Sequence, residues 1–187
     1  MIIGITGKSG SGKSTIANII GEEFDFVVID VDKVAHKVLT FDAYKYFLEK
    51  FGITAPGNVV DRKFLGKYLF NNNEMMEAYN AFIYELIKIE LNNLMQDKTK
   101  NYCLDWNFLP ITNLFLECDL KILMKCDVFE RRKRVKLRDN IDDAYFDARE
   151  SKCLEYNEDD YDLVLVNTNL HEKKDEVKKV LGGVLWK

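Results

Sequence analysis

The sequence predicts an α/β fold in which a five-stranded parallel sheet lies between helical layers. Its apolar runs are short and nearly continuous, and they lie at residues 2–6, 26–30, 102–105, 120–125 and 162–167. Runs without alternation are typical of parallel strands covered on both faces. Stretches with helical spacing separate them, which is the βαβ pattern. Because right-handed crossovers bring the loops after the strands to one edge of the sheet, we expect the ligand site there.

A glycine-rich loop, the phosphate loop, follows the first predicted strand. Residues 7–15 read GKSGSGKST and fit G-x-x-x-x-G-K-[ST] between a strand and a helix. Glycines let backbone N–H groups point at phosphate oxygens, and the positive end of the next helix adds to the same site. The loop predicts a P-loop NTPase-like, three-layer α/β/α fold that binds a nucleoside triphosphate. The residues assigned to binding are Gly7, Gly10, Ser11, Gly12, Lys13, Ser14 and Thr15.

Three side chains are candidates for phosphate or metal contact. We expect Lys13 to reach the β- and γ-phosphates and the Ser14 hydroxyl to ligate Mg²⁺. Asp105 ends the third predicted strand, where a P-loop protein holds its magnesium-bound water. A solvated aspartate at a strand end is the alternative for Asp105.

Two further carboxylates, Asp30 and Asp32, stand where the second predicted strand ends. In an extended chain, residues two apart point the same way, so both are expected to project close to the phosphate loop. There Asp32 is suited to accept the proton of an attacking hydroxyl. The structural alternative is that Asp32 only caps a helix over residues 33–39.

A basic helix is predicted after Asp127, which has the spacing of a capping box with Glu130. At 100° per residue, Arg131, Arg134 and Arg138 fall within about 60° of one another, on one face. Such a face is suited to a lid that closes over ATP and neutralises the transferring phosphoryl group. A solvated basic stripe is the alternative. Arg134 and Arg138 are the two arginines we assign to catalysis.

The chain of 187 residues predicts one domain. Residues 40–96 show no strand signal, and this helical insertion is either an acceptor-binding region or additional core. The last segment, which includes Val177, Leu181 and Leu185, predicts an amphipathic helix that closes the sheet. The expected parts are a core of residues 1–39, 97–126 and 160–187, an acceptor-binding region of residues 40–96, and a lid of about residues 127–159.

Composition narrows the class of protein. The net charge of −4 argues against a general nucleic-acid binder. The four cysteines lack C-x-x-C spacing, so we expect reduced thiols, no zinc and a cytoplasmic location. No apolar run is long enough to span a bilayer, so no membrane partner is expected. The sequence carries no indication of the oligomeric state.

Several segments together resemble the dephospho-CoA kinase family. Residues 28–38, VIDVDKVAHKV, resemble its D-A-D-x-x-A-[RH] segment, and residues 60–70 resemble L-D-R-x-x-L-G-x-x-[VI]-F. Arg134 with Arg138 and the following aspartate resembles its lid R-x-x-x-R-D, and residues 161–167 resemble A-D-x-V-I-x-N. The chain departs from the family pattern at Tyr84, Glu85 and Asn107, and in the lid.

This resemblance implies an ATP- and Mg²⁺-dependent kinase that phosphorylates the ribose 3′-hydroxyl of dephospho-CoA, the last step of coenzyme A synthesis. It implies that Asp32 orients or deprotonates the acceptor and that Arg134 and Arg138 close over the phosphates. A nucleoside or nucleoside-monophosphate kinase is the alternative, and a non-catalytic ATP-dependent regulator is the third. A regulatory GTPase is disfavoured because N-K-x-D and D-x-x-G are missing from the sequence.

Overall fold

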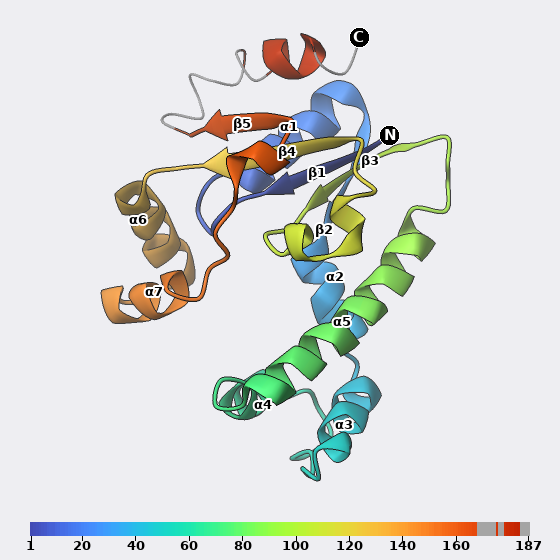
Figure 1. Ribbon diagram of the computed structural model, residues 1–187, viewed down its shortest axis with the longest axis vertical. Coiled ribbons are helices and arrows are strands. Elements are labelled where there is room, and N and C mark those ends of the chain that lie inside the picture. The colour runs from blue at the N-terminus through green and yellow to red at the C-terminus, as the bar shows by residue number, and fades with distance from the viewer. Residues whose placement is uncertain (168–174, 176–177, 184–187) are drawn as a thin grey trace. The chain divides into compact units, whose positions relative to one another are not determined.

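The structure is a computed structural model that describes residues 1–167, 175 and 178–183. Its five strands form one parallel sheet of order β2-β3-β1-β4-β5, with β1 at the centre (Figure 1). The strands are β1 (Ile2–Thr6), β2 (Phe26–Asp30), β3 (Asn101–Asp105), β4 (Leu120–Lys125) and β5 (Leu163–Val166). The predicted parallel sheet is therefore confirmed, with each strand within one residue of its predicted bounds.

Helices and short 3₁₀ turns connect these strands. The helices are α1 (Lys13–Phe24), α2 (Val31–Val38), α3 (Phe41–Lys50), α4 (Arg62–Leu69), α5 (Asn73–Leu94), α6 (Val128–Asp139) and α7 (Asp143–Glu150). The 3₁₀ turns are η1 (Leu109–Ile111), η2 (Asn113–Phe115) and η3 (Glu158–Asp160). None of the helices in these described segments is long and apolar enough to cross a membrane.

The central strand β1 is buried on both faces because its residues alternate between two packed layers. Ile3 and Ile5 are fully buried in the core that includes Ile16 and Ile20 of α1. Gly4 points the other way, where a Cβ would lie 2.6 Å from Leu109 of η1 and 2.8 Å from the Cys118 sulfur. The near-continuous apolar run of β1 thus reflects cover from α1 on one face and from the η1–η2 segment on the other.

The chain divides into two compact units. The sheet unit is Met1–Asp30 with Lys98–Lys187, and the helical unit is Val31–Asp97. In the sheet unit, the described residues 178–183 are helical and Leu181 is fully buried in the core. The predicted closing helix is thus present there, while Val177, Val184 and Leu185 lie outside the described residues. The division into core, acceptor-binding region and lid stays a prediction.

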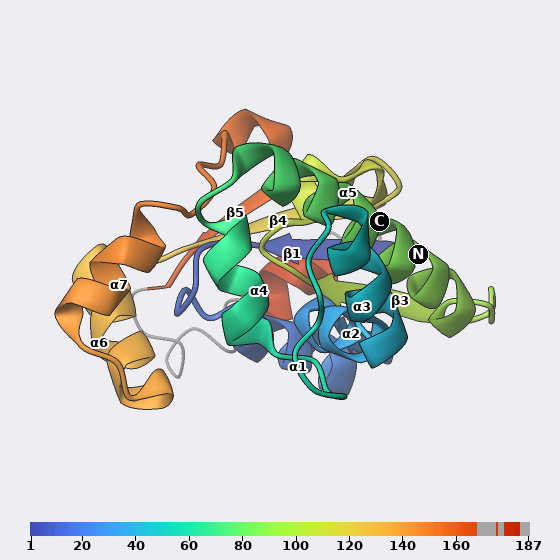
Figure 2. The same ribbon diagram turned by 90° about the horizontal axis from the view of Figure 1, so that it is seen from below.

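The helical unit contains α2 to α5 (Figure 2) and, as predicted, no strand among its residues. Its buried residues are mainly aliphatic, with an aromatic cluster around the buried Phe47, whose ring is 5.3 Å from that of Tyr79 and 5.5 Å from that of Phe82. The Asp61 side chain accepts a hydrogen bond from the Phe64 N–H at 2.9 Å, which confirms the predicted N-cap of α4. Side-chain capping and aromatic packing therefore both contribute to the stability of this unit.

Candidate functional site

The phosphate loop leads directly from β1 into α1, which begins at Lys13. The Ser11 N–H donates to the Lys8 carbonyl at 3.1 Å, which tightens the turn. Gly7 has φ 141°, and a Cβ on it would lie 2.3 Å from the Met124 carbonyl oxygen, so only glycine fits. The first turn of α1 holds no acidic residue of its own, and the positive end of its dipole favours an anion at the loop.

A hydroxyl and a carboxylate meet where α1 begins. The Ser14 Oγ donates to Asp105 Oδ2 at 2.6 Å, and Asp105 is buried at the end of β3. Parallel pairing fixes this place, because Asp105 is in register with Ile5 of β1 and with Asp30 of β2. The alternative of a solvated Asp105 is therefore wrong. Hydroxyl and carboxylate oxygens are ligands that Mg²⁺ prefers, so the pair fits the predicted metal site.

The expected geometry of Asp32 is wrong in detail. The extended chain ends at Asp30, and α2 begins at Val31, so the two-residue alternation does not reach Asp32. Asp32 is exposed in the first turn of α2 and does not precede a helix over 33–39 as a cap. Asp30 belongs to the sheet unit and Asp32 to the helical unit. Nothing in the sequence around Asp30 indicates that a helix begins directly after the strand, with no loop residue between them.

The predicted arginine face of α6 contacts the phosphate loop. Arg131 Nη1 donates to the Ser9 carbonyl at 3.3 Å, and Arg134 Nη1 donates to the Gly10 carbonyl at 3.4 Å. Arg138 Nη2 donates to the Ser9 hydroxyl at 3.2 Å. Because all three reach the loop and Arg131 is buried, the alternative of a merely solvated stripe is wrong.

The loop and α6 also pack backbone to backbone. Gly10 has φ 79°, and a Cβ on it would meet the Val135 Cγ2 at 2.9 Å and the Arg131 carbonyl oxygen at 3.0 Å. The predicted N-cap of α6 is confirmed, since Asp127 Oδ1 accepts from the Phe129 N–H at 2.8 Å. The α6 helix is thus fixed at its start and pressed against the phosphate loop.

The side of α6 that carries Arg132 and Lys136 contacts α7. We call the two helices, residues 128–150, the α6–α7 hairpin. Arg132 contacts Asp143 at 3.1 Å and Asp147 at 2.5 Å, and its guanidinium lies 4.8 Å from the Phe146 ring centroid. Lys136 contacts Asp143 at 2.6 Å. The acidic residues Asp143 and Asp147, which follow the basic helix in the sequence, therefore pair α7 with α6.

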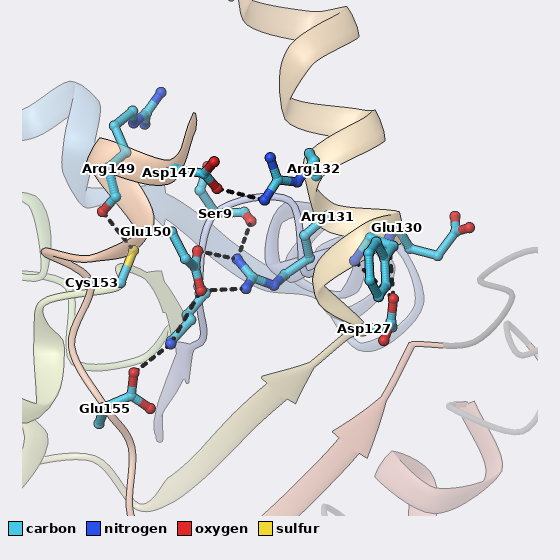
Figure 3. Close-up of polar contacts among 12 residues, drawn as sticks. Ser9, Asp127, Glu130, Arg131, Arg132, Asp147, Arg149, Glu150, Cys153 and Glu155 are labelled. Carbon is cyan, nitrogen blue, oxygen red and sulfur yellow. Dashed lines mark hydrogen bonds and ion pairs between the residues drawn. The ribbon is translucent and has the colours of Figure 1, made fainter. Parts of the chain in front are cut away.

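Sequence reasoning missed a charged group that joins the hairpin to the loop. Glu150, the last residue of α7, binds Arg131 through both oxygens, at 2.6 and 2.9 Å (Figure 3). It also contacts Lys8 at 3.3 Å. The hydrogen bonds from Arg131 hold the pKa of the Glu150 carboxyl below its ordinary value, against the effect of burial. The sequence separation of 142 residues between Lys8 and Glu150 leaves no local signal for this contact.

Asn167 is a second residue at the loop that local sequence patterns did not mark. Its Nδ2 donates to the Ser11 carbonyl at 2.8 Å and its backbone N–H to the Lys125 carbonyl at 2.7 Å. The side chain is buried, so this bond ties the end of β5 to the phosphate loop away from water. Asn167 ends the segment that resembles A-D-x-V-I-x-N, and this resemblance is the sequence feature that could have identified it as a site residue.

A cavity of about 430 Å³ borders the charged group formed by Lys8, Arg131 and Glu150. Its lining includes Lys8, Arg131 and Glu150, together with Cys126 and Tyr156. The Tyr156 hydroxyl donates to the Asn107 carbonyl at 3.0 Å, which joins the segment after α7 to the segment after β3.

Comparison with known proteins gives one consistent result. A family model described as Dephospho-CoA kinase matches residues 1–172. The dephospho-CoA kinase of Clostridium tetani is 32% identical, over 95% of this chain and 83% of that protein. That of Carboxydothermus hydrogenoformans is 29% identical, over 100% of this chain and 95% of that protein.

Solved structures agree on the fold. The crystal structure of TT1252 from Thermus thermophilus has a TM-score of 0.82 at 25% identity, and covers 98% of this chain and 97% of that one. Shikimate kinase from Bacteroides thetaiotaomicron has a TM-score of 0.56 at 15% identity, with 100% and 99% covered. The second likeness extends to the fold alone.

Proposed function

Because the chain belongs to the dephospho-CoA kinase family, we propose that the residues around its phosphate loop divide the work of one phosphoryl transfer. The enzyme transfers the γ-phosphoryl group of ATP to the ribose 3′-hydroxyl of dephospho-CoA, giving coenzyme A and ADP in the final step of coenzyme A synthesis. Family membership favours this acceptor over the nucleosides and nucleoside monophosphates that the sequence left open.

The donor half of the reaction falls to the phosphate loop. Its N–H groups and Lys13 hold the triphosphate, and Arg134 and Arg138 neutralise charge on the moving phosphoryl group. The observation that carries this assignment is the 2.6 Å contact between Ser14 and Asp105, at the start of the loop helix. When bound there, Mg²⁺ would neutralise charge on the phosphate oxygens, with Ser14 as a ligand and Asp105 holding its water.

The acceptor half falls to Asp32. The 3′-hydroxyl oxygen forms a bond to the γ-phosphorus while the bond from that phosphorus to the β–γ bridging oxygen breaks, and ADP leaves. The proton of the hydroxyl passes to the Asp32 carboxylate. Its exposed place in the first turn of α2 leaves the carboxylate accessible to a substrate. A cytoplasmic location also stays part of the proposal.

One assay tests the activity. ADP release from ATP is measured with dephospho-CoA and with a panel of nucleosides and nucleoside monophosphates, in Mg²⁺ and after chelation. We expect release only with dephospho-CoA and only with a divalent cation. Release stimulated equally by a nucleoside, or by no acceptor at all, would contradict the proposal.

A substitution tests the role of Asp32. Asp32→Asn should lower kcat by about 10² to 10³-fold, in the range of general-base catalysis, while ATP still binds. Asp42→Asn is the matched control, because Asp42 is also exposed in the first turn of a helix of the helical unit. Near-normal turnover of Asp32→Asn would remove Asp32 from this role.

A further inference from the structure

One carboxylate, that of Glu150, is held between two cations from distant parts of the sheet unit (Figure 3). Arg131 comes from the first turn of α6, and Lys8 comes from the phosphate loop. Arg131 binds both oxygens of Glu150, which is the strongest geometry for such a pair. Lys8 also contacts Glu155 at 2.6 Å.

These groups differ in burial, and the difference indicates which of their ion pairs contributes more to stability. Arg131 is only 4% exposed, whereas Glu155 is 86% exposed at its side chain. An exposed ion pair contributes little, but a buried guanidinium that loses its carboxylate keeps an uncompensated charge. Glu150 is therefore the partner on which Arg131 depends.

The same group joins three segments of chain. Glu150 ends α7, Arg131 lies in the first turn of α6, and Arg131 also donates to the Ser9 carbonyl of the phosphate loop. By contrast, the pair of Arg132 with Asp147 joins α6 to α7 only, and Asp147 is exposed. Several ion pairs thus cross the described hairpin, and the pair of Glu150 with Arg131 is one whose arginine also contacts the loop.

The three arginines of the loop-facing side of α6 are not equivalent. Arg131 is committed to a bidentate carboxylate. Arg138 also binds both oxygens of its exposed neighbour Asp139, at 2.7 and 3.0 Å. The loop contacts of Arg134 and Arg138, however, are single bonds to neutral oxygens, at 3.4 and 3.2 Å. Bonds of that kind exchange more easily for phosphate oxygens than a charge-assisted pair does.

We propose that Glu150 is a positioning residue: it fixes Arg131 and Lys8 together, holds α6 on the phosphate loop, and so sets where Arg134 and Arg138 stand for the donor phosphates. This inference rests on the proposed function, in which those two arginines act on ATP. It assigns Arg131 to anchoring and not to the substrate.

The kinetic consequence has a definite sign. Glu150→Gln leaves two cations without their shared carboxylate beside an anion site, and these still attract ATP. The catalytic arginines, however, lose their fixed place, and misplacement of about 1 Å can cost on the order of 100-fold in rate. We expect kcat to fall by about tenfold to 100-fold while the KM for ATP stays equal or falls.

A double-mutant cycle on the intact enzyme tests the proposal. The variants Glu150→Gln, Arg131→Gln and the double variant are compared by kcat and by KM for ATP, after circular dichroism shows that each is folded. Since both residues serve one contact, adding Glu150→Gln to Arg131→Gln should change kcat by less than about twofold. The matched control pair, Arg132→Gln and Asp147→Asn, should leave kcat within about twofold of the parent.

Four outcomes overturn the proposal: an unchanged kcat for folded Glu150→Gln, a raised KM for ATP as its main effect, additive losses in the cycle, or an equal loss in the control pair. If Glu150→Gln does not fold, Lys8→Gln is measured instead, and a parental kcat for it also overturns the proposal. The variants Arg134→Ala and Arg138→Ala distinguish a failure of the proposed function from a failure of the Glu150 inference. If both retain activity, the proposed function is wrong about the lid; if both lose it while Glu150→Gln is silent, only this inference fails.

Discussion

The two units of the chain are stabilised by different means. In the sheet unit, charged side chains reach the phosphate loop from residues far away in sequence, as Glu150 does to Lys8. In the helical unit, Phe47 packs between the rings of Phe51, Tyr79 and Phe82. Fixed charges adjust a reaction without filling a core, whereas aromatic packing fills a core. Substitutions should therefore affect rate first in one unit and stability first in the other.

The largest effect is expected in the sheet unit. Lys13→Met removes the cation assigned to the β- and γ-phosphates, so kcat should fall about 10³-fold, which corresponds to about 4 kcal/mol. The unfolding midpoint should stay within a few degrees, since Lys13 lies at a helix start and outside the core. Steady-state kinetics and thermal unfolding check this, with Lys45→Met on α3 as the control. A loss of stability comparable to the loss of rate would break the comparison between the units.

The second effect belongs to the helical unit. Phe47 is 2% exposed, and Phe47→Ala should lower the free energy of unfolding by about 3 kcal/mol through lost burial and the cavity left behind. Urea denaturation measures it, and Phe47→Leu, which keeps most of the volume, should cost less. A change below about 1 kcal/mol would show that the aromatic cluster contributes little to the stability of this unit.

The helix caps sharpen the comparison, because each unit has an aspartate N-cap. Asp61→Ala and Asp127→Ala should each lower the free energy of unfolding by about 1 kcal/mol. Asp61→Ser should restore the stability, because serine also caps. If Asp61→Ser has the stability of the parent but a lower kcat than the parent, then Asp61 has a role beyond the cap.

The smallest effect concerns pH. The pKa of Glu150 lies below its ordinary value of 4.5 because of Arg131, so its stabilising contribution is complete above pH 4.5 and is lost as pH falls through the lower folded value. The difference in unfolding free energy between the parent and Glu150→Gln should hold constant from about pH 8 to pH 5 and close in acid. Urea titrations over this range measure it. A difference that shrinks already between pH 8 and 6 would show that the Glu150 carboxyl does not carry it.

Local sequence patterns predicted the strands well. Apolar runs such as 2–6 and 120–125 coincide with β1 and β4, because a strand buried on both faces tolerates few polar residues. The arginine face of α6 was predictable from helical periodicity alone. Asp61 and Asp127 were recognisable as caps, since the bond closes within three residues.

Long-range contacts could not be predicted in the same way. Nothing adjacent in sequence marks Lys8 and Glu150 as partners, and Asn167 bonds to Ser11 across 156 positions. The place of Asp32 failed for another reason, because the chain passes from strand to helix between Asp30 and Val31 without a turn residue. Periodicity gives the elements, whereas the pairing of charges depends on how the elements meet.

The order of the strands has a consequence for folding. Phe26 of β2 pairs with Asn101 of β3, so their ladder closes only after the whole helical unit has been bridged. An open chain of that length raises the entropic cost of closure, by about 0.6 kcal/mol for each doubling, and non-local strand pairing is slow. Helices that form within the insertion shorten the open chain. We therefore expect Phe47 and its neighbours to affect how fast the edge of the sheet assembles, as well as how stable their own unit is.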